Sequence, residues 1–273
     1  MNSRKNSRWV SKGVLVACLV AVVLLGLPAV SSAQTFVGTI PDGRVSDTVN
    51  IAAAGTVCFY FFGIAGRSYS VEVQGSIGAN QSFTEFFGAA GAICPGATAA
   101  GYTITTTNDP PHVGPGGNPP FFGRRASFVA PSTGLYMVTV NNTGGGTGAF
   151  KYSVSDKTLF NPLWSTFSGF ETFYRIQNTT NASCMVTLNL RNDAGALVGG
   201  SPRTVTVAAN STFTTLHTGP GAFPPAMAVA DNLAGGATFT HDCPPGAIQI
   251  DGFLGNFAGT PIVLPIKIVS ARE

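Results

Sequence analysis

Thr56-Val-Cys-Phe-Tyr-Phe-Phe62 and Ser68-Tyr-Ser-Val-Glu-Val73 are the two stretches that indicate the fold of this chain most clearly. Both are rich in β-branched and aromatic residues, and a stretch that contains Gly66 separates them. Residues of this kind favour strands, and glycine breaks favour turns. The two stretches therefore predict two consecutive β-strands.

Runs of the same kind continue along the chain, separated by clusters of Gly, Pro and Asn. No amphipathic stretch with helix caps interrupts them, so we predict an all-β protein with two antiparallel β-sandwich domains, Ig-like or jelly-roll-like in type. The further strands are expected at 102–106, 126–129, 135–140, 150–154, 172–176, 185–190, 204–207, 212–216, 237–240, 247–250 and 262–268.

The domain boundaries follow from this strand map. We expect a first domain at residues 34–156, a linker at 157–169 and a second domain at 170–273. About 240 residues are enough for one large or two ordinary domains, so chain length permits this division.

Residues 1–33 have the pattern of a secretory signal peptide. Four basic residues precede an apolar run of 14 residues, Val14–Leu27, and Ser31-Ser32-Ala33 offers a cleavage site before Gln34. An uncleaved anchor is the alternative, but a span needs roughly 20 residues. We predict cleavage after Ala33, no transmembrane segment in the mature chain, and a secreted or cell-surface location, with the periplasm as the alternative.

Lipid attachment at Cys18 is a second alternative for the leader. Leu15-Val-Ala-Cys18 matches the pattern of bacterial lipoproteins. The match lies only five residues after Lys12, inside the apolar run and not at its end. We therefore expect export without lipid.

The charge of the mature chain argues against nucleic-acid binding. Four of the 15 basic residues lie in the leader, which leaves 11 basic against 12 acidic residues. A chain with a net charge near −1 offers no basic face that could neutralise several phosphates. We therefore expect no nucleic-acid partner.

Four cysteines remain after the leader is removed: Cys58, Cys94, Cys184 and Cys243. Four cysteines allow three pairings. The pairing that respects the domain boundary joins Cys58 to Cys94 and Cys184 to Cys243. Each bridge would stabilise the fold by about 3 to 5 kcal/mol, mainly by constraining the unfolded chain. Four buried free thiols are the alternative, and the spacings do not suit zinc.

The first half also resembles a known family. Ala65-Gly-Arg-Ser-Tyr-Ser-Val-Glu-Val73, Pro131-Ser-Thr-Gly-Leu-Tyr-Met-Val-Thr-Val140 and Gly148-Ala-Phe-Lys-Tyr-Ser-Val154 are similar to segments of the bacterial pre-peptidase C-terminal domain family. The resemblance covers residues 35–156. It implies a small exported β-sandwich of bacterial type that accompanies secreted enzymes without itself being catalytic.

No motif in the sequence indicates catalysis, a metal site or a cofactor. His112, His217 and His241 do not stand at metal-ligand spacings, and no known hydrolase or calcium-loop signature occurs. His241-Asp242-Cys243 could be interpreted as a cysteine nucleophile with its base, but Cys184 is a plausible disulfide partner for Cys243. We therefore expect no catalytic residue, no metal and no cofactor.

The best candidate for a binding surface is the segment 118–125. Residues 108–123 are rich in proline and glycine and are expected to form an exposed loop. Within residues 118–125, two prolines directly precede Phe121, Phe122, Arg124 and Arg125. Stiffly held aromatic and arginine side chains suit an interface. The alternative is that the phenylalanines cap the core and the arginines are solvated.

Two classes of function remain. The first is a secreted or cell-surface binding or structural protein without catalytic activity, whose partner is a surface polysaccharide or a protein. The second is an accessory module for a secreted hydrolase or for polysaccharide binding. An enzyme is the third and least supported class, because the fold alone carries no chemistry.

Overall fold

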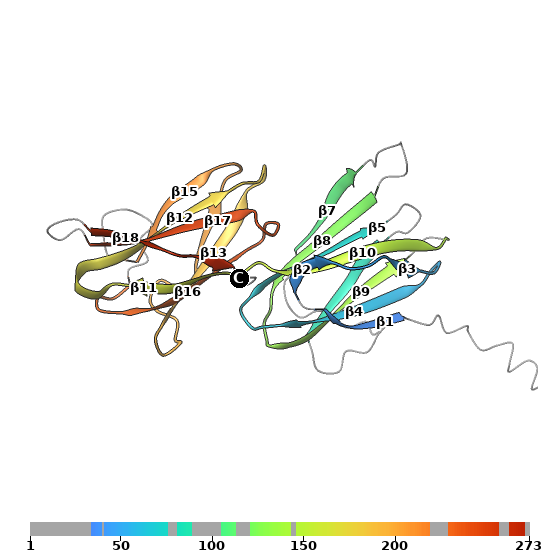
Figure 1. Ribbon diagram of the computed structural model, residues 1–273, viewed down its shortest axis with the longest axis horizontal. Helices are drawn as coiled ribbons and strands as arrows, with labels where there is room; N and C mark the ends of the chain where they lie inside the picture. Colours follow the sequence, from blue (N-terminus) through green and yellow to red (C-terminus); the bar gives the residue numbers. More distant parts are fainter. Residues whose placement is uncertain are drawn as a thin grey trace, which may run out of the picture. The chain divides into compact units, whose positions relative to one another are not determined.

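The computed structural model describes residues 34–39, 41–75, 81–88, 105–112, 121–142, 146–218, 229–256 and 262–270 (Figure 1). Within these ranges the regular secondary structure is β-strand, apart from a 3-10 turn, η1 (Phe167–Gly169), and turns and irregular segments connect the strands. This confirms the all-β prediction. No helix in the described part of the chain is long and apolar enough to cross a membrane. The leader lies outside the described residues, so its cleavage stays a prediction.

The first ten strands form two sheets (Figure 1). One sheet has the order β1-β4-β9-β6, and the other has the order β2-β10-β5-β8-β7, with β3 also paired to β10. Neighbouring strands are antiparallel except β1 and β4, which are parallel. The strands are β1 (Gln34–Thr39), β2 (Asp42–Val45), β3 (Val49–Ile51), β4 (Thr56–Gly63), β5 (Ser68–Gly75), β6 (Gln81–Gly88), β7 (Thr105–His112), β8 (Phe121–Val129), β9 (Gly134–Asn142) and β10 (Gly148–Asp156).

The remaining strands form a second pair of antiparallel sheets, with the orders β14-β13-β16-β11-β19 and β15-β12-β17-β18. Their bounds are β11 (Leu159–Ser165), β12 (Phe170–Asn178), β13 (Cys184–Asn192), β14 (Arg203–Val207), β15 (Thr212–His217), β16 (Ala234–His241), β17 (Ile248–Asn256), β18 (Ile262–Ile266) and β19 (Val269–Ser270). The chain turns at Asn192–Gly195, where Gly195 N donates to Asn192 O at 2.8 Å.

Each pair of sheets encloses its own hydrophobic core, as expected for β-sandwiches. The first core is aromatic: Phe59 of β4 stacks on Tyr152 of β10 with ring centroids 3.9 Å apart. The second core is mainly aliphatic and contains one large indole, Trp164, whose Nε1 donates to the carbonyls of Arg191 and Gly236 at 3.0 Å. In strands such as β12 and β13, buried residues alternate with more exposed ones, so that one face of each sheet packs against its partner sheet.

The structure corrects the expected linker at 157–169. Strand β11 lies inside this segment and pairs with β16 and β19. Its Trp164 is fully buried. Pro162 argues against a strand in the sequence, because proline has no backbone N–H to donate to a neighbouring strand. In the structure, the register of β11 with β16 shifts between Asn161 and Trp164 and so accommodates this proline.

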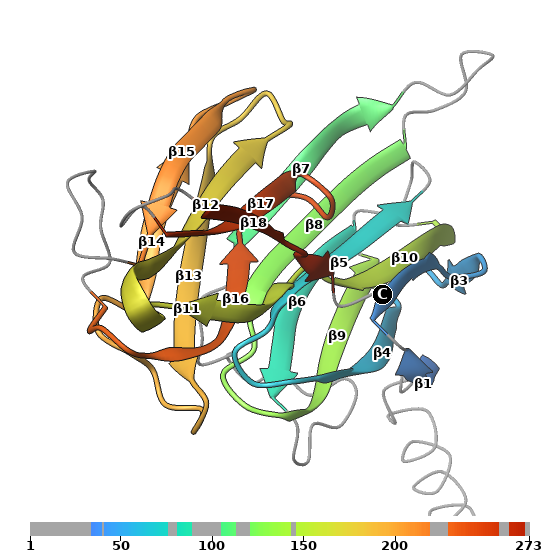
Figure 2. The same ribbon diagram turned by 60° about the vertical axis from the view of Figure 1, so that its left-hand side comes forward.

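The structure also corrects the expected loop at 108–123. Thr105–His112 forms β7, and β8 begins at Phe121 (Figure 2). β7 is the edge strand of its sheet, and its register with β8 shifts between Asp109 and His112. Pro110 and Pro111 fall at this irregularity, which is where an edge strand tolerates proline. Residues 113–120 lie outside the described part of the chain.

Candidate binding site

A cleft of about 370 Å³ lies where residues from both pairs of sheets meet. Its walls come from the start of β5, the end of β8, the start of β13 and the end of β16. Serine and threonine hydroxyls, the His241 imidazole and the Asp242 carboxylate form the polar lining. Phe128, Val129 and Met185 form the apolar part. The combination of apolar walls with a few polar groups is typical of small-ligand sites.

Ser68, the first residue of β5, connects this cleft to the segment between β10 and β11. Its backbone N donates to Thr158 Oγ1 at 2.9 Å, and its carbonyl accepts from Lys157 N at 2.8 Å. Its hydroxyl donates to the carbonyl of His241 at 3.1 Å. Ser68 is 1% exposed, so these bonds form away from solvent and hold the first pair of sheets to the second.

Lys157 lies behind the cleft and is 4% exposed. Its Nζ donates to Ser127 Oγ of β8 at 3.1 Å and to the carbonyl of Cys243, which follows β16, at 2.9 Å. Within the described ranges, no carboxylate forms an ion pair with this ammonium group. Burial lowers the pKa of Lys157 from 10.5 to about 7, while the Asp242 charge partly opposes this shift. The amine is therefore partly neutral near pH 7.

His241 is buried at the end of β16, with 6% of its surface exposed. Burial, and to a lesser extent the nearby Lys157 charge, lowers the pKa of this imidazole to about 3. Its Nδ1 makes no hydrogen bond to any residue that the structure describes. The ring is neutral at physiological pH and is a poor general base, since an effective base has a pKa near the working pH.

Asp242 and Cys243 tie the end of β16 to the start of β13. Asp242 Oδ1 accepts from Met185 N at 2.8 Å. Cys184 and Cys243 form a disulfide with a Cα–Cα distance of 5.6 Å, which confirms this part of the predicted pairing. Because the Cys243 sulfur is in a disulfide, it is neither the thiolate nucleophile that we considered nor a ligand for a metal held with Asp242.

For the other predicted disulfide, the structure describes only one of the two cysteines. Cys58 is disulfide-bonded and completely buried. Cys94 lies outside the described residues. The pairing of Cys58 with Cys94 therefore stays a prediction.

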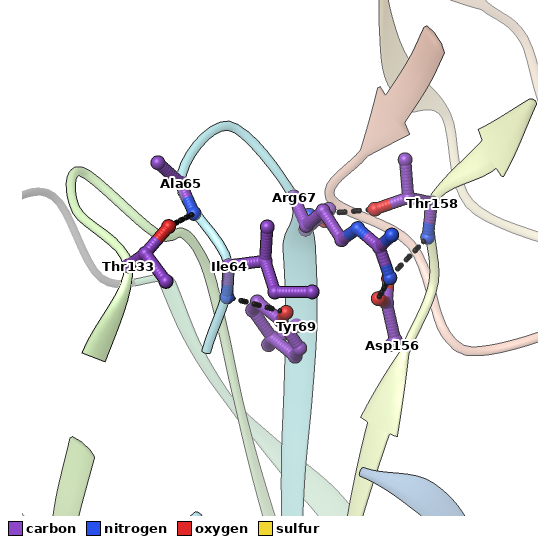
Figure 3. A network of polar contacts seen from close by, with 8 residues as sticks. Ile64, Ala65, Arg67, Tyr69, Thr133, Asp156 and Thr158 are labelled. Carbon is purple, nitrogen blue, oxygen red and sulfur yellow. Dashed lines mark hydrogen bonds and ion pairs between the residues drawn. The ribbon is translucent and has the colours of Figure 1, made fainter. Parts of the chain in front are cut away.

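A network of charged and polar groups surrounds Arg67 and Asp156 at the same connection (Figure 3). Arg67 Nη1 and Asp156 Oδ2 form an ion pair at 3.0 Å, and Asp156 Oδ1 accepts from Thr158 N at 3.0 Å. The Arg67 guanidinium also lies over the Phe160 ring, 5.0 Å from its centroid. Arg67 thus joins the β4–β5 turn to the end of β10 and to β11.

Glycines shape the turn that presents Arg67. Gly66 has a φ of +77°, a conformation that favours glycine. A Cβ on Gly63 would lie 2.7 Å from the ring of Tyr136, so only glycine fits beside this tyrosine. Ile64 N donates to Tyr69 Oη at 2.8 Å, and burial raises the pKa of Tyr69 to about 12. The turn is therefore fixed by packing and by hydrogen bonds.

The predicted binding loop is placed differently by the structure. Phe121, Phe122, Arg124 and Arg125 belong to β8, which pairs with β5 on one side and β7 on the other. Their backbone is part of a sheet and not of a proline-stiffened loop, because the prolines before them lie outside this strand. Arg125 is half-buried opposite Glu72; the other three side chains lie outside the described part of the structure.

Sequence reasoning missed Ser68 and Lys157 and considered Asp242 only as part of a catalytic cluster. A signal for Lys157 does exist: in a chain with only 10% charged residues, Asp156-Lys157-Thr158 places one charge at the end of β10 and a second directly after it. Ser68, Lys157 and Asp242 come together only through the pairing of β5 with β10 and of β13 with β16.

A comparison of the chain with models of protein families finds no match, and a comparison with curated proteins finds no significant relative.

Proposed function

We propose that this chain is exported and acts outside the cytoplasm as a non-catalytic binding or structural protein. The observation that carries the proposal is the cleft at Ser68, Phe128, Met185 and Asp242. It combines hydroxyl, carboxylate and apolar groups, and its walls come from both pairs of sheets. The resemblance of residues 35–156 to the pre-peptidase C-terminal family supports an exported accessory role.

The chemistry of the cleft favours binding over catalysis. His241 has a depressed pKa, and the sulfur of Cys243 is in a disulfide. Asp242 already accepts a hydrogen bond from Met185 N. Among the described residues that line the cleft, no nucleophile is hydrogen-bonded to an effective base, the arrangement expected for covalent catalysis. A surface polysaccharide or a protein segment is the partner that we propose.

Export and binding can be tested together. The secreted protein should begin at Gln34, as measured by N-terminal sequencing and intact mass. The purified protein should then cosediment saturably with cell-envelope polysaccharide or surface protein. Asp242→Asn should weaken cosedimentation at least several-fold, whereas Asp251→Asn, on an exposed ion pair, should leave it unchanged. Retention in the cytoplasm with an intact leader, or equal binding by both variants, would contradict the proposal.

A second candidate is an accessory module that docks on a secreted hydrolase. Phe62 and Leu135 lie directly opposite each other on β4 and β9 and are 53% and 39% exposed; Ile64, which follows β4, is 37% exposed. Adjacent exposed apolar side chains suit contact with another protein. Phe62→Ser should abolish co-purification with a secreted hydrolase from the same cells, while cleft binding persists. Loss of cleft binding in Phe62→Ser would count against this second role.

A further inference from the structure

Lys157 occupies the one position in the described chain that holds the two pairs of sheets together through a side-chain amine. The residue belongs to the connection between β10 and β11. Its Nζ reaches Ser127 in the first pair and the carbonyl of Cys243 in the second. Both acceptors are uncharged, so the amine bridges the pairs without a counter-ion in direct contact.

The groups that face Lys157 do not compensate a full positive charge. Asp242 and Glu72 favour the charged amine, whereas Arg125 opposes it. His241 is neutral and contributes no charge, and Asp156 is engaged by Arg67. Burial therefore dominates, because a charge taken out of water is costly unless a partner stands close to it.

Both acceptors of Lys157 belong to segments that shape the cleft. Ser127 is itself part of the lining, and Cys243 directly follows Asp242. Ser68, which also lines the cleft, accepts at its carbonyl from the backbone N of Lys157. A change at Lys157 is therefore transmitted to the walls of the cleft through direct hydrogen bonds.

We propose that protonation of Lys157 loosens the contact between the two pairs of sheets and so makes the cleft respond to pH. Neutral Lys157 donates to both acceptors at little desolvation cost. Protonated Lys157 is stabilised when its ammonium reaches water, and it does so by withdrawing from Ser127 and Cys243. The cleft is then closed and fixed above neutral pH and loosened below it. The regulatory role rests on the proposed binding function, but the loosening itself does not.

Residual dipolar couplings of backbone amides test the loosening without any ligand. At pH 8.5 one alignment tensor should fit the amides of both pairs of sheets. At pH 5.5 the wild-type protein should need two tensors of different magnitude. In Lys157→Met and Lys157→Gln, one tensor should suffice at both pH values, and Lys151→Met, which removes an exposed amine from β10, should behave as wild type.

A single wild-type tensor at both pH values would overturn the proposal. Two tensors at pH 5.5 in Lys157→Met or Lys157→Gln would also overturn it, since another group would then carry the response. If the wild-type tensors separate as expected but no polysaccharide or protein binds the cleft, the proposed function fails and the pH-dependent contact stands.

Discussion

Asp156 and Lys157 are neighbours in the chain, both are buried, and they meet opposite electrostatic environments. Asp156 has a guanidinium at 3.0 Å and a backbone N–H at 3.0 Å. Lys157 has a hydroxyl and a carbonyl but no carboxylate in contact within the described structure. The charge of Asp156 is therefore compensated by its partners, whereas the fold disfavours the charged form of Lys157. Burial alone therefore does not determine how a charged residue contributes to stability; the partner does.

The largest expected effect of this difference is a dependence of stability on pH. The pKa of Lys157 is about 7 in the folded protein and near 10.5 in the unfolded chain, so the unfolded chain binds more protons between these values. The free energy of unfolding should therefore rise with pH from 7 to 10.5, by a few kcal/mol, and the contribution should be lost below pH 7. Chemical denaturation at several pH values measures it.

The matched variants isolate this contribution from other titrating groups. Lys157→Met should remove most of the rise between pH 7 and 10.5, and Lys151→Met should retain it. An equally steep rise in Lys157→Met and wild type would show that Lys157 does not carry the effect.

A smaller effect is expected from removing the compensated charge. Asp156→Asn leaves the Arg67 guanidinium without its counter-ion, but Arg67 is about one-third exposed and retains solvent and the Phe160 ring. We expect a loss of about 1 to 3 kcal/mol in the free energy of unfolding. Asp251→Asn, which breaks an ion pair whose members are both more than half exposed, should cost less than about 1 kcal/mol. Equal losses in the two variants would refute the distinction between buried and exposed pairs.

The smallest expected effect is a difference in stability between alanine variants of two equally buried serines on β5. Ser68→Ala removes the bond to the His241 carbonyl and should cost about 1 to 2 kcal/mol. Ser70 Oγ has no hydrogen-bond partner among the described residues, so Ser70→Ala should be neutral within about 0.5 kcal/mol, or stabilising. Thermal unfolding of both variants provides the comparison, and a larger loss in Ser70→Ala would contradict it.

The fold was predictable from the sequence to a large extent, and the candidate site was not. Alternating strands such as β13 (Cys184–Asn192) can be recognised in the sequence, because the alternation of buried and more exposed residues is a local pattern. Strand β11 and most of the edge strand β7, beyond the strand expected at 102–106, were not predicted, because Pro162 and the Pro110-Pro111 pair are typical of loops. Only the pairing with neighbouring strands shows that a bulge accommodates these prolines. The surroundings of Lys157 come from Ser127 and Cys243, 30 and 86 residues away, and no local pattern encodes such contacts.

The most direct test of this account is the titration of Lys157 itself. The Nζ and Cε resonances of Lys157, assigned by comparison with Lys157→Met, can be followed by NMR from pH 5 to pH 11. We expect a midpoint near 7, because the amine is buried between Ser127 and the Cys243 carbonyl. A midpoint near 10.5 would mean that Lys157 is solvated, and the contact that forms the cleft would not exist as described.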